Sequence, residues 1–122
     1  MQSTQQVKER ILNGELNQVL LDLYYDESIL ETQKKRYTKA IENFEHLYGA
    51  KEIEIYSAPG RTEIGGNHTD HQNGKVLAAS INLDAIAVVA KTDNTIVKVT
   101  SEGYPDLAID ISVLEPKKEE TG

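Results

Sequence analysis

The spacing of apolar residues changes near residue 50 of this 122-residue chain. Before that point, apolar residues recur every three, four and seven positions, which is the period of an amphipathic helix. Three helices are predicted, over 3–12, 15–24 and 28–48, and Asn13-Gly14 separates the first two. Their predicted inward faces are Val7, Ile11 and Leu12, then Leu16, Val19, Leu20 and Leu23, and then Leu30, Tyr37, Ile41, Phe44 and Tyr48.

The third helix carries signals at both of its ends. Ser28 and Glu31 have the spacing of a capping box, in which each side chain binds the backbone amide of the other residue. Gly49 follows the last apolar position, and glycine there adopts the left-handed conformation that closes a helix.

After residue 50 the apolar residues alternate with polar ones, which is typical of strands. The first strand is predicted over 53–57, and Asn73-Gly74 predicts a turn. The segment 80–90 is nearly all apolar and predicts a strand buried on both faces or against helices. Residues 95–100 are expected to form its hairpin partner, and the alternation over 107–111 predicts a last, half-buried strand.

Helices followed by strands predict an α+β fold with a mixed or antiparallel sheet. The net charge of −7 and the pI near 4.9 argue against a nucleic-acid partner and against an anionic membrane surface. The chain has no cysteine, which excludes disulfides and fits a cytoplasmic location. No apolar run approaches eighteen residues, so neither a membrane span nor a signal peptide is expected.

One stretch concentrates the reactive side chains of the chain, namely Gly60-Arg61-Thr62-Glu63-Ile64-Gly65-Gly66-Asn67-His68-Thr69-Asp70-His71-Gln72. It combines a permanent cation, two imidazoles, two carboxylates and adjacent glycines after a predicted strand end. Such a density of titratable groups indicates a site rather than a packed surface.

Three chemical interpretations of this stretch compete. Arg61 could bind a carboxylate or phosphate bidentately, or could form a structural salt bridge. His68, Asp70 and His71 could bind zinc. A hydrolase-type histidine motif would need a histidine at position 66, which is Gly66, so no metal is predicted. Asn67, His68 and Asp70 could instead hydrogen-bond the hydroxyls of a sugar, or could satisfy the backbone of a local turn.

The residues from Ser57 to Asp70, followed by Asn73-Gly74-Lys75-Val76-Leu77, resemble the galactokinase signature of the GHMP sugar and metabolite kinases. The resemblance covers about residues 30 to 115. It implies the fold of the N-terminal part of a GHMP kinase, which is ribosomal protein S5 domain 2-like. The implied domains are an N-terminal helical segment over 1–27, a sugar-binding region over 28–114 and a flexible tail over 115–122.

The resemblance also implies the roles of individual residues. Asn67, His68 and Asp70 would hold the hydroxyls of galactose, and Arg61 would be catalytic, near the anomeric hydroxyl and the transferred phosphate. Gly60, Gly65 and Gly66 would shape the backbone. Asn67 stands where the family usually has glutamate, so a related hexose, an amino sugar or an inactive sugar sensor remain alternatives.

The activity implied for the full-length enzyme is transfer of the γ-phosphoryl group of ATP, with Mg²⁺, to the anomeric hydroxyl of galactose. The family's phosphate-binding loop and catalytic aspartate would follow residue 122. The chain is therefore expected to be an inactive N-terminal fragment without bound cofactor, whose partner is the C-terminal part of the same polypeptide.

Overall fold

A computed structural model of the chain describes residues 1–66 and 73–115, which fall into two compact units. The first unit, Met1–Ala90, contains three α-helices and the longest strands. The second unit, Lys91–Gly122, contains one described hairpin. The predicted α+β class is confirmed, whereas the S5-like assignment and the domain boundary at residues 27 and 28 stay predictions.

The three predicted helices are present in the first unit, as α1 (Thr4–Leu12), α2 (Asn17–Tyr24) and α3 (Leu30–Tyr48). Gly14 has a φ of +90° in the turn between α1 and α2, and Gly49 has a φ of +80° where α3 ends. Glycine adopts such positive φ values without steric cost, so both signals in the sequence mark real ends of helices.

The predicted capping box at Ser28 is wrong. A 3₁₀ turn, η1 (Glu27–Ile29), precedes α3, and Ile29 occupies the N-cap position without a side-chain hydrogen bond. The carboxylate of Asp26 accepts hydrogen bonds from both the backbone amide and the hydroxyl of Ser28, at 2.8 and 2.6 Å. Because Asp26 binds both of these groups in a local turn, Ser28 does not cap α3.

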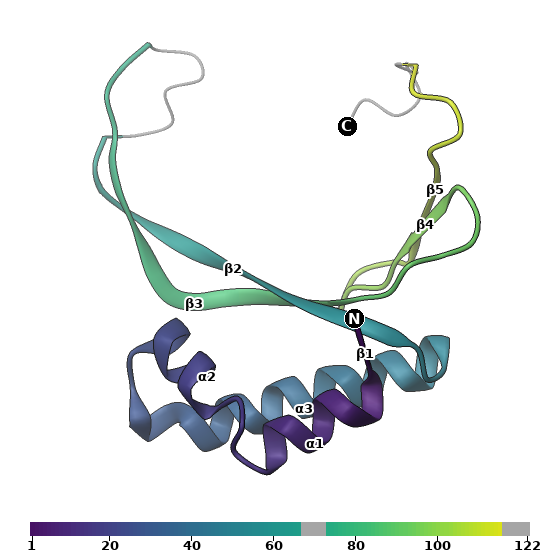
Figure 1. Cartoon of the computed structure of the whole chain (residues 1–122). Helices are drawn as coiled ribbons and strands as arrows, with labels where there is room; N and C mark the ends of the chain where they lie inside the picture. The colour runs from purple at the N-terminus through teal and green to yellow at the C-terminus, as the bar shows by residue number, and fades with distance from the viewer. Residues whose placement is uncertain (67–72, 116–122) are drawn as a thin grey trace. The chain divides into compact units, whose positions relative to one another are not determined.

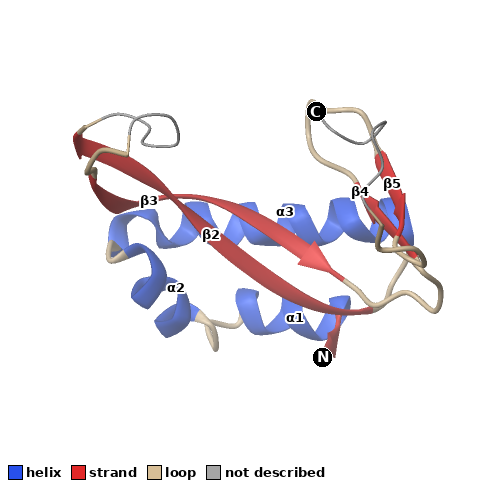
Figure 2. Ribbon diagram, turned by 90° about the horizontal axis from the view of Figure 1, so that it is seen from above, coloured by secondary structure: helices blue, strands red, loops and turns tan. Residues whose placement is uncertain are grey.

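A three-stranded antiparallel sheet covers one side of the helices (Figures 1 and 2). Its order is β1 (Gln2–Ser3), β2 (Glu52–Gly65) and β3 (Leu77–Val89). We call the long β2–β3 pair the ribbon. The expectation that the first strand ends at Ser57 is wrong, because Pro59 lies beside a register irregularity, where a strand tolerates proline.

The hydrophobic core lies between the helices and one face of the ribbon. Its buried members are Ile11, Leu20, Tyr24, Tyr37, Ile41 and Ile53. Side chains such as Ile55 of β2 and Val88 of β3 pack against it, while their neighbours along each strand face away. Of the two alternatives predicted for 80–90, burial on both faces is wrong and packing against helices is confirmed for one face, which carries Ile86, Val88 and Ala90.

Part of the predicted inward face of the helices is also wrong. Leu12 is 64% exposed, whereas Ile11 is 1% exposed, and Val19 and Leu23 are exposed as well. Adjacent helical residues differ by about 100° in direction, so the position that points at α3 excludes its neighbour.

The second unit contains β4 (Ile96–Val99) and β5 (Leu107–Asp110), which pair antiparallel. The prediction that 95–100 pairs with the 80–90 strand is wrong, since its partner is β5. Thr95 donates a hydrogen bond to the carboxylate of Asp110 at 2.8 Å, which joins the start of β4 to the end of β5. The strand predicted over 107–111 is confirmed as β5, but both strands are exposed, so its predicted half-burial is wrong.

Two further expectations concern a membrane span and the segments beyond the described residues. In the described part of the chain, no helix combines the length and the apolar character needed to cross a bilayer. Of the predicted tail over 115–122, the residues from 116 onward lie outside the described part of the chain. Residues 67–72, which precede the predicted Asn73-Gly74 turn, lie outside it as well.

We expect Ile41→Ala to lower the free energy of unfolding by about 2–5 kcal/mol, because Ile41 is 0% exposed and its loss leaves a cavity. Leu12→Ala is the matched control, and its effect should stay below about 0.5 kcal/mol. Urea denaturation followed by circular dichroism measures both. Equal losses in the two variants would contradict the described core.

Candidate functional site

The structure places the first half of the predicted site on the ribbon. Gly60, Arg61 and Gly65 belong to β2, and Gly66 follows directly. The predicted sugar-binding residues Asn67, His68 and Asp70 lie outside the described residues, as does His71. The site residues therefore stay predictions, whereas the strand that leads to them is described along its whole length.

Arg61 lies on an exposed part of β2, opposite Ser80 of β3. Its side chain is 67% exposed, and its Nε lies 3.9 Å from the Oε1 of Glu63. Residues two apart on a strand share a face, so this pair is local. An ion pair this long and exposed contributes at most about 1 kcal/mol, which leaves the guanidinium able to bind an anion instead.

Gly60 sits at an irregularity in the pairing of the two strands. Pro59 pairs with Asp84, but Arg61 pairs with Ser80, so Gly60 alone faces the three residues 81–83. A Cβ at Gly60 would lie 3.2 Å from the carbonyl oxygen of Leu83. This close approach gives a physical reason for glycine at position 60.

The two adjacent glycines differ in their surroundings. Gly66 has a φ of +98°, and a Cβ there would lie 2.8 Å from the carbonyl oxygen of Lys75 and 3.1 Å from Val76. A Cβ at Gly65 would meet no atom within 4 Å. The geometry therefore demands glycine at position 66 and not at position 65.

A buried polar cluster lies around Asp84, which pairs with Pro59, the residue before Gly60. We call it the Asp84 cluster. Its centre is the carboxylate of Asp84, whose side chain is 4% exposed. Asp84 accepts hydrogen bonds from Tyr24 of α2 at 2.7 Å, from Ser57 of β2 at 2.5 Å and from Arg36 of α3 at 2.6 Å. Arg36 also donates to the backbone carbonyl of Asp84 at 2.7 Å, and the hydroxyls of Tyr24 and Tyr37 are 2.9 Å apart.

These contacts stabilise the charged form of Asp84. Burial alone would raise the pKa of this carboxyl, but the hydrogen bonds from Ser57, Arg36 and Tyr24 outweigh burial and hold the pKa below its usual range. Burial and the neighbouring Tyr37 and Asp84 raise the pKa of the Tyr24 hydroxyl, which therefore remains a donor.

No pattern in the sequence predicted this cluster. Its partners are 27 to 60 residues apart from Asp84, so no local spacing marks it. The available signal was the single carboxylate inside an apolar run over 80–90, because a buried charge requires partners.

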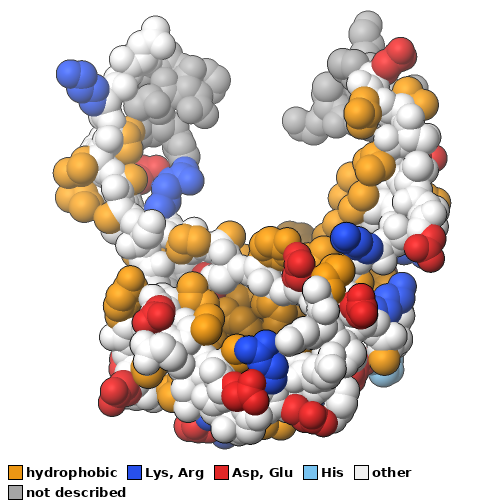
Figure 3. Space-filling view, in the orientation of Figure 1, with side chains coloured by type: hydrophobic (Ala, Val, Ile, Leu, Met, Phe, Trp, Pro, Cys, Tyr) orange, Lys and Arg blue, Asp and Glu red, His pale blue; other side chains and the backbone are white. Residues whose placement is uncertain are grey.

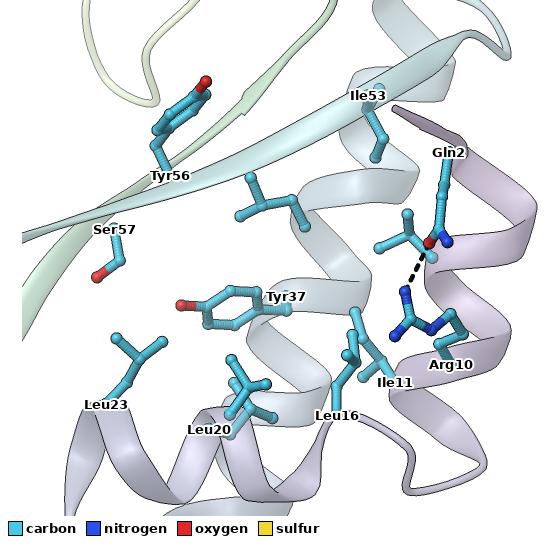
Figure 4. A pocket seen from close by; sticks show the side chains of 13 residues that line it. Gln2, Arg10, Ile11, Leu16, Leu20, Leu23, Tyr37, Ile53, Tyr56 and Ser57 are labelled. Atoms are coloured by element: carbon cyan, nitrogen blue, oxygen red, sulfur yellow. Dashed lines mark hydrogen bonds between the residues drawn. The ribbon is translucent and has the colours of Figure 1, made fainter.

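A cavity of about 410 Å³ opens between α1, α2 and β2 (Figure 4). Its walls are mostly apolar, and Tyr37 reaches across it from α3 toward the side on which Ser57 lies. None of the described signature residues from Gly60 to Gly66 lines it. Figure 3 shows hydrophobic side chains gathered at this hollow, where the ribbon meets the helices.

The metal alternative rested on His68, Asp70 and His71, which lie outside the described residues. Among residues 1–66 and 73–115, no three His, Cys, Asp or Glu side chains form a group that could hold a metal ion.

The segment that contains the ribbon is similar to known proteins. Residues 42–91 match the galactokinase galactose-binding signature. Galactokinase of Lactococcus lactis subsp. lactis (strain IL1403) is 34% identical over 80 residues, which are 62% of this chain and 20% of that protein. Galactokinase of Dictyostelium discoideum is 36% identical over 87 residues, 67% of this chain and 17% of that protein.

Galactokinase of Streptomyces coelicolor is 37% identical over 60 residues, 49% of this chain and 16% of that protein. No solved structure matches the chain. Residues 42–91 therefore carry a galactokinase signature, and the resemblance inferred from the sequence is confirmed. The chain spans at most about a fifth of the length of these curated relatives.

We expect Gly66→Ala to lower the free energy of unfolding by more than about 1 kcal/mol, because φ is positive and Lys75 blocks the new Cβ. Gly65→Ala should change it by less than about 0.5 kcal/mol. Thermal denaturation of both variants measures the contrast. A Gly65→Ala variant as unstable as Gly66→Ala would be inconsistent with the described backbone.

The stability that Asp84 provides should depend on pH. Because its pKa in the folded chain lies below the unfolded value of about 3.9, the charged form stabilises the fold above that pH. The difference in unfolding free energy between the wild type and Asp84→Asn should be constant above about pH 5 and shrink as the pH falls further. Urea denaturation between about pH 2.5 and 7 measures it, and a difference that grows in acid would refute the assignment.

Proposed function

We propose that this chain supplies the sugar-binding part of a galactokinase-like enzyme, which transfers the γ-phosphoryl group of ATP to the anomeric hydroxyl of galactose. The observation that carries the proposal is the galactokinase signature over residues 42–91, with Arg61 held on an exposed part of β2. The proposed sugar-binding residues are Asn67, His68 and Asp70.

Phosphoryl transfer depends mainly on positioning and on the stabilisation of developing charge. The guanidinium of Arg61 suits the second task, because it is permanently charged and matches phosphate oxygens bidentately. Its weak local ion pair with Glu63 leaves it able to make such contacts. In the proposal, Arg61 faces the reacting oxygen while Asn67, His68 and Asp70 orient the sugar.

ATP and Mg²⁺ belong to the proposed activity of the complete gene product. The proposal assigns the residues of this chain to the sugar and to the transferred phosphate.

The test is an ATP-dependent phosphorylation assay of the complete gene product with galactose, glucose and N-acetylgalactosamine. We expect a sugar 1-phosphate from galactose, identified by ³¹P NMR. Phosphorylation of another sugar would favour the substrate alternative that Asn67 raises, and galactose binding without turnover would favour a sensor. The proposal would be overturned if the protein neither bound nor phosphorylated any of these sugars.

We expect Arg61→Ala to lower kcat for galactose by about 10²–10³-fold, the usual cost of one preorganised charge-stabilising donor, with much less change in galactose affinity. Asp70→Ala should instead weaken galactose binding in an NMR titration. Arg10→Ala and Asp106→Ala remove the same charges from positions outside 42–91 and serve as controls. An unchanged kcat in Arg61→Ala would exclude the assigned role of Arg61.

A further inference from the structure

The outer half of the ribbon has little support from the helices. Among the described residues of 60–66 and 77–83, all are exposed except Ile81, which is half-buried. Figure 1 shows this end of the ribbon continuing beyond α2 and away from the helical layer. The place of Arg61 therefore depends on strand pairing rather than on packing against a helix.

From Glu54 to Glu63 the ribbon contains two different registers, and a further shift lies between Glu63 and Gly65. From Glu54 to Pro59 each residue number and its partner add up to 143, as in Pro59 with Asp84. From Arg61 to Glu63 the numbers add up to 141, as in Arg61 with Ser80. Gly60 lies where the two registers meet.

The pattern of apolar residues is equally compatible with both registers. A slip of one residue would turn every side chain to the other face, but a slip of two residues keeps each on its own face. If the outer register continued inward, Ile55 would face Ile86 and Ser57 would face Asp84. Those positions belong to the same face of the ribbon, so the core would remain apolar.

The Asp84 cluster distinguishes the two registers where the pattern does not. A slip of two residues would move Asp84 by about 6.6–6.8 Å along the strand. Its present hydrogen bonds to Tyr24 and Arg36 measure 2.7 and 2.6 Å, and both partners are held by helices. The shifted carboxylate would lose these partners but would remain near the core. A buried charge without partners strongly destabilises a fold.

We propose that Asp84 is a positioning residue, which holds the inner register through Arg36 and Tyr24 and thereby maintains the irregularity at Gly60 that aims Arg61. Irregularities of this kind bend a strand and redirect its side chains. The part of this inference that concerns catalysis by Arg61 rests on the function proposed above, whereas the part that concerns the register does not.

The decisive experiment is NMR of the chain, with cross-strand nuclear Overhauser effects as the readout. In the wild type, contacts of Pro59 with Asp84 and of Arg61 with Ser80 should coexist. In Asp84→Ala the inner register should shift to the outer one, with a contact of Pro59 with Asn82 in place of the contact of Pro59 with residue 84. A contact of Arg61 with Asn82 would instead show that the inner register does not need Asp84 and would overturn the inference. Glu54→Gln is the matched control, because it removes a carboxylate from the opposite face of the same ribbon and should keep both wild-type contacts.

Survival of both wild-type contacts in Asp84→Ala, with only a lower melting temperature, would overturn the inference. If Asp84→Ala does not fold, Tyr24→Phe and Arg36→Gln each remove hydrogen bonds to Asp84 and should weaken protection of the Arg61 and Ser80 amides in hydrogen exchange. Unchanged protection in both variants would overturn it equally.

The catalytic part is tested in the complete gene product. Asp84→Ala should lower kcat for galactose by about a hundredfold, as a small misplacement of a catalytic group does. KM should change far less, and Asp84→Asn should restore part of kcat. Ile41→Val is the control for lost stability and should leave kcat unchanged.

If Ile41→Val lost as much kcat as Asp84→Ala at the same loss of melting temperature, the role of Asp84 would be merely structural. If the gene product phosphorylates no sugar, the proposed function fails, and the NMR result still decides the register.

Discussion

The arrangement of the first unit depends on one buried carboxylate. Taking Asp84 out of water costs several kcal/mol unless hydrogen bonds and an opposite charge replace its hydration. The replacement comes from Tyr24 of α2, Arg36 of α3 and Ser57 of β2. Because three elements must converge on one side chain, the helices and the ribbon have one relative placement that satisfies it.

The helices could be predicted from the sequence because their information is local. A period of 3.6 residues and glycines at 14 and 49 mark α1, α2 and α3 with small errors at the ends. The errors arose where two local signals competed. Asp26 was the stronger partner for Ser28, and Ile11 rather than Leu12 took the inward position.

The pairing of the strands could not be predicted in the same way. Alternation marks a strand but does not name its partner, so 95–100 was assigned to the wrong neighbour. Pro59 and Gly60 read as the end of a strand, although β2 continues through them with a change of register. The irregularity depends on contacts with β3, which begins at residue 77.

In the candidate site, too, residues marked by a local pattern could be predicted and residues joined by long-range contacts could not. Arg61 and the glycines could be predicted as site residues because a family signature is contiguous in sequence, whereas the hydrogen-bond partners of Asp84 lie far from it along the chain. The signature match covers 42–91, but Tyr24 and Arg36 lie outside it. The signature is thus not a portable module. A graft of residues 42–91 onto another scaffold would carry the carboxylate of Asp84 and the hydroxyl of Ser57 without the cation and the phenol that neutralise and enclose them, so an engineer who moves this motif must move the two helices as well.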